Sequence, residues 1–197
     1  EVRRPAALMR AIRHGVRQDG TSLIAMPSEI YTHLSDEHLA AIVAYLKRVP
    51  AVDRQVAPTH FRFLGRVMLA TGRLPILVAP KTPQAAHVAT SADTSAIGRG
   101  RYLADIGGCH GCHGHGLSGG RVAGPPGLPP ASNLTPAGLG GWSEADFVRA
   151  MRAGVRPDGT VIDEFMPWRV LGRMSDDELH ALWSYLASVP PRATGTK

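Results

Sequence analysis

The sequence lacks a long hydrophobic run, and this absence excludes a membrane-spanning helix within it. Its best apolar stretch, residues 74–79 (LPILVA), is far shorter than the ~20 residues that a transmembrane helix needs. No signal peptide is visible. No block of Lys and Arg is interleaved with aromatic residues, which argues against nucleic acid as a partner. The net charge of +6 lies mostly outside residues 98–197, which carry 10 basic and 9 acidic side chains.

The sequence also lacks any visible catalytic constellation. No acid–base pair and no nucleophile with a partner base stands out, so we expect no catalytic residue. The apolar content is ordinary at 44%, so the chain is not disordered. Its 22 glycines and 16 prolines predict long loops and short helices, and its length suits one or two small domains.

One module of ~40 residues occurs twice in the chain. Residues 10–50 align with residues 149–190, with one extra residue in the second copy. Each copy predicts a short helix that ends at glycine, a turn marked by Asp-Gly and an irregular Met-Pro stretch. A second helix then begins at a serine cap and ends at a proline. The paired landmarks are Gly15 and Gly154, Asp19 and Asp158, Met26 and Met166, Ser35 and Ser175, and Pro50 and Pro190.

The second copy has an upstream partner, which contains both cysteines, and the first copy lacks one. The sequence therefore predicts a complete domain over residues 97–190, with a tail over 191–197. Residues 1–50 are expected to be the C-terminal half of a second such domain. Residues 51–96 are expected to be a linker, in which residues 59–74 can form a helix.

The only two cysteines lie in the stretch GRYLADIGGCHGCH, which contains a C-x-x-C-H pattern. This pattern is typical of covalent attachment of c-type haem. The stretch can form a helix whose end is loosened by glycines. Because positions i, i+3 and i+4 share one helix face, Cys109, Cys112 and His113 would point the same way. Two thiols can then reach the vinyl groups of one porphyrin while the imidazole reaches the iron.

Three other interpretations fit the cysteine window less well. A zinc site needs more soft ligands, and His110 and His115 are poorly spaced to close a tetrahedron. We expect both to be exposed loop residues. A thioredoxin-like pair needs a βαβ setting, and no strand-rich pattern surrounds the window. A structural disulfide leaves His113 unexplained.

A second axial ligand is expected downstream, and the repeat selects it. The domain offers Met151, Met166 and Met174, where the first module has isoleucine, methionine and leucine. Only Met166 keeps a thioether in both copies, whereas the other two positions tolerate aliphatic residues, as packing positions do. Pro167 restricts the residue before it to extended backbone, so Met166 would be presented on a stiff loop.

Together these residues resemble a class I cytochrome c domain. They are most similar to the periplasmic multi-haem cytochrome c subunits that accompany membrane-associated alcohol, aldehyde and gluconate dehydrogenases. The resemblance rests on GRYLADIGGCHGCHG, SNLTPAGLGGWSEADFVRAMRAGVRPDG, FMPW and MSDDELHALWSYLASVP, which cover nearly all of residues 97–190.

The resemblance implies an all-α fold wrapped around haem c, with two thioether links and two axial ligands. It also places an amide and an indole near the haem propionates, although the first could be only a turn residue and the second only core. Two consecutive prolines would shape the loop on the histidine side. The implied residues are Cys109 and Cys112 for the links, His113 and Met166 for the iron, Asn133 and Trp142 for the propionates, and Pro125 and Pro126 for the loop.

Residues 1–50 resemble the tail of a preceding domain of the same kind. Met26 then looks like an axial ligand to a second haem, bound only if the other half of the domain is supplied. The chain could be a fragment, another polypeptide could complete the site, or the first module could have lost its haem. We favour a fragment, because the apolar stripe from Leu39 to Leu46 would otherwise lack a partner.

The expected function is electron transfer by covalently bound haem c, from a dehydrogenase to a quinone, an oxidase or another cytochrome. With both axial positions filled by protein, the iron has no open site for a substrate, so we expect an electron-transfer protein or subunit and not an enzyme. Two alternatives stay open: a haem enzyme with a labile Met ligand that acts on a small substrate, and a haem-free interaction module. Covalent haem predicts the bacterial periplasm as the location.

Overall fold

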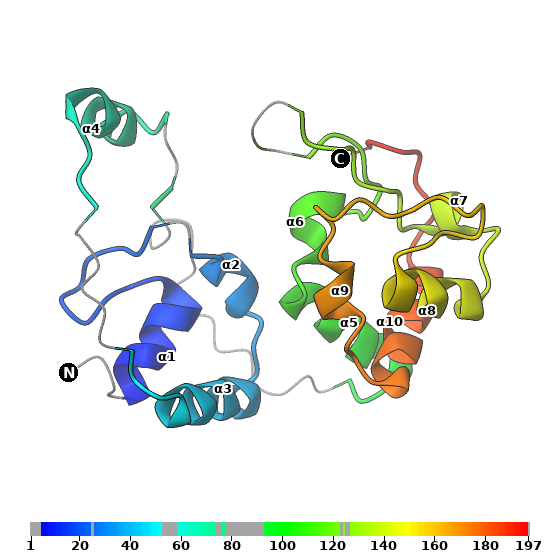
Figure 1. Cartoon of the computed structure of the whole chain (residues 1–197), viewed down its shortest axis with the longest axis horizontal. Helices are drawn as coiled ribbons and strands as arrows, with labels where there is room; N and C mark the ends of the chain where they lie inside the picture. Colours follow the sequence, from blue (N-terminus) through cyan, green and yellow to red (C-terminus); the bar gives the residue numbers. More distant parts are fainter. Residues whose placement is uncertain are drawn as a thin grey trace. The chain divides into compact units, whose positions relative to one another are not determined.

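The computed structural model describes residues 5–24, 26–52, 59–73, 76–77, 93–122, 124 and 127–196. These residues form helices (Figure 1), with a few isolated β-bridges between loops, which confirms the all-α prediction. The chain divides into two compact units, Glu1–Thr90 and Ser91–Lys197. Pro125 and Pro126, which were expected to shape a loop, lie outside the described residues.

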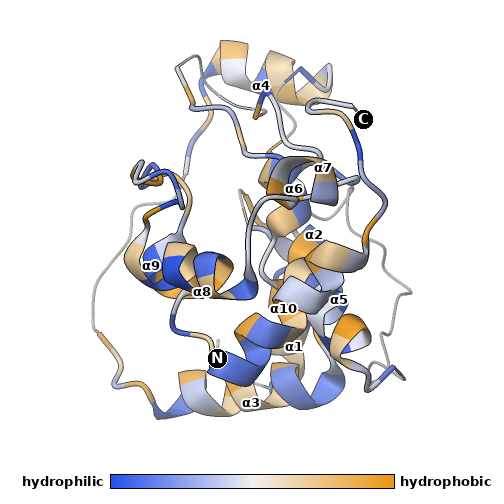
Figure 2. Ribbon diagram, turned by 90° about the vertical axis from the view of Figure 1, so that its right-hand side faces the viewer, coloured by the Kyte–Doolittle hydropathy of each residue, from blue (hydrophilic) through white to orange (hydrophobic). Residues whose placement is uncertain are grey.

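The N-terminal unit packs its first helix against the next two. Its buried apolar side chains are Ile12, Leu34, Leu39 and Val43. The helix expected within residues 59–74 is present over a shorter range, and its ribbon is mostly in hydrophobic colours in Figure 2. The helices of this unit are α1 (Pro5–His14), α2 (Ser28–Tyr31), α3 (Asp36–Arg48) and α4 (Phe63–Ala70).

The C-terminal unit is built around two helices that run side by side, α5 and α10 (Figures 1 and 2). Gly100 allows their close approach, because a Cβ atom there would lie 2.7 Å from Cβ of Tyr185 on α10. The core cluster includes Ala104 of α5 and, from α10, Leu179, Leu182 and Leu186. The helices are α5 (Ala96–Ile106), α6 (Cys109–His113), α7 (Pro136–Leu139), α8 (Glu144–Ala153), α9 (Trp168–Leu171) and α10 (Asp176–Ser188).

Two helices stand where the sequence suggested one. The helix expected over the cysteine window breaks at Gly107 and Gly108, and α6 begins separately at Cys109. Gly108 has a φ of 72°, a left-handed conformation that ends α5. The glycines therefore interrupt the helix instead of only loosening its end.

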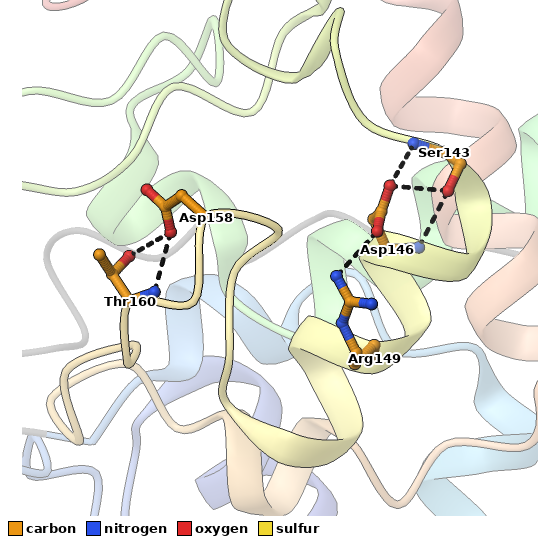
Figure 3. Close-up of polar contacts among 5 residues, drawn as sticks. All are labelled: Ser143, Asp146, Arg149, Asp158 and Thr160. Atoms are coloured by element: carbon orange, nitrogen blue, oxygen red, sulfur yellow. Dashed lines mark hydrogen bonds and ion pairs between the residues drawn. The ribbon is translucent and has the colours of Figure 1, made fainter.

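Serine caps begin α3 and α10, as predicted at Ser35 and Ser175. Ser175 and Glu178 form a full capping box. The same arrangement occurs at the start of α8, where Ser143 and Asp146 exchange side-chain and backbone hydrogen bonds (Figure 3). These bonds satisfy N–H groups that a helix start otherwise leaves without partners.

The repeated module forms the same local structure in both units. A left-handed glycine ends the first helix of each copy, with φ values of 64° at Gly15 and 68° at Gly154. The following turn is closed in both copies by an isolated β-bridge and by an Asp side chain that accepts from the Thr two residues on, as Figure 3 shows for Asp158. An ion pair of 2.7 Å then links the first and last helices, Arg13–Asp36 in one copy and Arg152–Asp176 in the other.

No helix in the described part of the chain combines the length and the apolar character needed to cross a membrane.

Candidate haem-attachment site

The two cysteines and the histidine of the C-x-x-C-H pattern lie on the short helix α6, at the i, i+3 and i+4 spacing that shares one face. Both thiols are free. Burial raises the pKa of the Cys109 thiol to about 11, so this thiol is neutral at neutral pH. Redox-active cysteines instead have a lowered pKa, which argues against the thioredoxin-like interpretation.

His113 is buried and oriented by one backbone contact. Its Nδ1 lies 2.7 Å from the carbonyl oxygen of Ser132. A carbonyl only accepts, so Nδ1 carries the proton and Nε2 keeps its lone pair for a metal. Burial lowers the pKa of His113, and the hydrogen bond to Ser132 opposes this in part. The ring is therefore neutral at neutral pH, the form that binds metals.

The other two histidines of the window differ from each other. His115 is exposed in a turn, as expected. The expectation that His110 is an exposed loop residue is wrong: it lies on α6, half-buried, with Nε2 3.1 Å from Oδ1 of Asp105. The hydrogen bond with Asp105 raises the pKa of His110. The i, i+5 spacing of this pair crosses the break at Gly108, so a continuous helix would not have suggested it.

Met166 lies in the irregular stretch between α8 and α9. It is half-buried and packs against the same core cluster as Cys109. Its backbone makes a tight corner, in which the backbone N–H of Trp168 donates to the Met166 carbonyl at 2.7 Å. The corner recurs in the first module: Pro167 has φ −76° and ψ 45°, and Pro27 has φ −80° and ψ 48°.

The sequence pattern of the Cytochrome c family matches residues 97–190, the stretch that holds α5 to α10. These residues form a cytochrome c domain. A domain of this family implies haem c as its prosthetic group.

Curated proteins similar to this chain include cytochrome c subunits of dehydrogenases. The cytochrome c subunit of alcohol dehydrogenase (quinone) from Gluconobacter oxydans is 35% identical over 122 residues, 57% of this chain and 25% of the relative. The gluconate 2-dehydrogenase cytochrome c subunit of Pantoea cypripedii is 35% identical over 115 residues, 54% of this chain and 26% of the relative. A diheme cytochrome c-type protein of Cereibacter sphaeroides is 29% identical over 205 residues, 94% of this chain and 65% of the relative. The chain thus spans less than two thirds of each of them.

The cytochrome c domain buries an indole next to the Met-Pro corner. Trp168 is 7% exposed, and its Nε1 has no hydrogen-bond partner among the described residues. The guanidinium of Arg169 lies 4.3 Å from the centre of the Trp168 ring. Sequence reasoning included Trp168 in the FMPW stretch but gave it no role of its own, because the first module has Ser28 at this position and the repeat therefore gave no signal.

The two residues expected near the propionates have other neighbours in the structure. The Asn133 side chain donates to the carbonyl of Arg192 at 2.8 Å and to the hydroxyl of Thr194 at 3.3 Å. The Asn133 amide thus donates within the protein, and its propionate role stays a prediction. Trp142 lines a groove of about 160 Å³ together with Trp183 of α10, and its propionate role stays a prediction.

The residues present fit haem c. Two free thiols and a neutral imidazole share one helix face, and the imidazole has its ligating nitrogen available. The indole N–H of Trp168, which has no partner among the described residues, adds a buried donor in the same domain. Cys109, Cys112 and His113 would hold the group, and Met166 lies on the separate stiff corner that sequence reasoning selected.

Proposed function

We propose that the chain is an electron carrier in which Cys109 and Cys112 form thioether links to haem c and His113 and Met166 are the axial ligands. When bound, haem c supplies an iron that takes up and releases one electron. Cys109 and Cys112 would hold this group, Ser132 would orient the His113 imidazole, and His113 and Met166 would bind the iron, so no site would remain for a substrate. Met/His ligation also raises the reduction potential.

The observation that carries this proposal is the hydrogen bond between Nδ1 of His113 and the carbonyl of Ser132. It fixes both the tautomer and the direction of the ring, which is the usual arrangement behind a metal-bound histidine. A histidine that served only the core would have no need to keep Nε2 free on the face that carries two thiols.

We further propose that the chain passes electrons from a dehydrogenase subunit to a respiratory acceptor in the bacterial periplasm. Relatives named as cytochrome subunits of alcohol, fructose and gluconate dehydrogenases support this part. The proposed thioether attachment of haem supports the location. The electron donor would be a protein that binds to this chain. One haem would be attached to this chain.

Residues 1–50 are proposed to be the C-terminal half of a second cytochrome c domain, with Met26 as the axial ligand of a second haem when the other half is supplied. The matching Met-Pro corners of the two modules support this. So does α3: Tyr45 and Leu46 are 69% and 45% exposed, whereas the matching Leu186 of α10 is 2% exposed in the unit that contains α5.

Optical spectroscopy of the ferric protein tests the ligation. We expect a sulfur-to-iron charge-transfer band that disappears in Met166→Leu. Met174→Leu is the matched control, because Met174 is also half-buried against the core and should keep the band. A native protein without the band at neutral pH would contradict the closed electron-carrier site and favour the haem enzyme. Haem that separates from the denatured chain would contradict the thioether links, and an intact mass gives the number of haems.

A further inference from the structure

The residues that follow α10 run back across the loop directly after α6. Gly195 N–H donates to the carbonyl of Ser118 at 3.2 Å, and the Ser118 hydroxyl donates to the carbonyl of Thr196. Ser118 is 1% exposed. We call residues 191–196 the C-terminal strap. It covers the loop whose Gly119 N–H donates to the carbonyl of His113 at 2.9 Å.

The strap is also bonded to the segment that faces His113. Asn133 donates to the carbonyl of Arg192 at 2.8 Å, and the Arg192 N–H donates to the Thr135 hydroxyl at 3.1 Å. The same hydroxyl donates to Oδ1 of Asn133 at 2.8 Å. Thr135 is 0% and Asn133 8% exposed, so Asn133, Thr135 and the strap form a buried, closed hydrogen-bond network.

This network fixes the peptide group that contacts the axial histidine. The carbonyl of Ser132 and the backbone nitrogen of Asn133 belong to one planar peptide unit, so the position of Asn133 determines the direction of that carbonyl. The carbonyl lies 2.7 Å from Nδ1 of His113. A second bond, from Leu134 N–H to the Leu117 carbonyl at 2.8 Å, keeps the segment against the loop after α6.

We propose that Asn133, Thr135 and the C-terminal strap are positioning elements that hold the Ser132 carbonyl on His113 and thereby set the electron-donating strength of the axial imidazole. The inference rests on the proposed ligation of the iron by His113. A carbonyl held close to Nδ1–H makes the imidazole a stronger donor, and a stronger donor favours the ferric state. Weakening the hydrogen bonds of the strap should therefore shift the equilibrium between ferric and ferrous haem toward the ferrous state.

Thr135→Val tests the inference with little change in side-chain shape. It removes the hydroxyl that links Asn133 to the strap. In a redox titration of the haem-loaded protein, the ratio of reduced to oxidised protein at a fixed ambient potential should rise about threefold, which corresponds to about 28 mV for one electron. Exchange of the His113 Nδ1–H with solvent, measured by NMR, should become faster. Thr135→Ser keeps the hydroxyl and should restore both values.

Two further variants separate positioning from stability. Ser175→Ala removes the cap at the start of α10, the end opposite to the strap; it should weaken the fold and leave the reduction potential unchanged. A chain that ends at Pro190 removes the strap and should shift the potential in the same direction as Thr135→Val. If Thr135→Val fails to fold, the shortened chain decides, since it leaves every helix in place.

An unchanged potential and unchanged Nδ1–H exchange in Thr135→Val, or in the shortened chain, would overturn the inference. A shift that Thr135→Ser does not reverse would overturn the role of the hydroxyl. The unmodified protein is first examined for the sulfur-to-iron band and for covalent haem. If these are absent, the proposed function fails; if they are present and the variants do not shift, only the positioning role fails.

Discussion

Replacing Gly154 with alanine is predicted to lower the free energy of unfolding of the cytochrome c domain by about 2–5 kcal/mol. Gly154 ends α8 with a φ of 68°, and a left-handed conformation costs a residue with a Cβ about 1–2 kcal/mol. That Cβ would also lie 2.5 Å from Cζ2 of Trp168, and such overpacking costs about 1–3 kcal/mol. The sum of the two costs is a large part of a domain's free energy of unfolding, which is about 5–15 kcal/mol.

Two controls separate the conformational cost from the contact with the indole. Gly159 has a φ of 82°, and a Cβ there would meet nothing within 4 Å, so Gly159→Ala should cost only about 1–2 kcal/mol. Trp168→Ser introduces the residue that the first module has at the matching position, Ser28. In that background Gly154→Ala should lose the contact part of its cost, which a double-mutant cycle measures directly.

The assay is unfolding of the haem-loaded protein in guanidinium chloride, followed by far-UV circular dichroism. The sulfur-to-iron band, recorded in parallel, reports whether the Met-Pro corner beside Trp168 stays in place. The reasoning is refuted if Gly154→Ala costs no more than Gly159→Ala, or if its cost is the same with tryptophan and with serine at position 168.

Three other outcomes are expected. Ser175→Ala should lower the stability by about 1 kcal/mol because it removes a capping box; an unchanged midpoint of thermal unfolding would contradict this. The Thr160 hydroxyl and backbone N–H lower the pKa of Asp158, so this stabilisation is present above about pH 4 and is lost as the pH falls through the folded-state pKa. In Asp158→Asn the free energy of unfolding should therefore fall less steeply as the pH is lowered through this range. An unchanged slope would contradict the stabilising role of the Asp158 carboxylate. Cys109→Ser/Cys112→Ser protein should be largely unfolded by circular dichroism, because the domain needs the porphyrin in its core; a cooperative helical apo-protein would disprove that.

The helices and turns of the repeated module were predictable because their signals are local. A glycine past a helix end, an Asp-Gly turn and a serine cap each act within a few residues of chain. The structure shows left-handed glycines at Gly15 and Gly154 and caps at Ser35 and Ser175. The spacing that places Cys109, Cys112 and His113 on one helix face is equally local.

The features that the sequence did not predict depend on backbone groups or on contacts between distant segments. The acceptor for His113 is a backbone carbonyl 19 residues away, and any residue type at position 132 would supply one. The pairing of His110 with Asp105 needs the break at Gly108, which separates α5 from α6. The donors of Asn133 point to the strap, a tail that carries no motif.

The two copies of the module show which part of the cytochrome c fold is encoded locally. The Arg13–Asp36 ion pair has the same 2.7 Å length as the Arg152–Asp176 ion pair of the other unit. It forms although the face of α3 that carries Tyr45 is exposed. In the C-terminal unit the equivalent face of α10 is covered by α5, which approaches closely because Gly100 has no side chain. The module therefore specifies its own turns and its Arg–Asp ion pair and buries one face of its last helix. Burial of the other face depends on a partner helix, which in the C-terminal unit has a glycine at the contact. The same partner helix leads directly into the cysteines, so in this domain the segment that completes the core is also the one that attaches the haem.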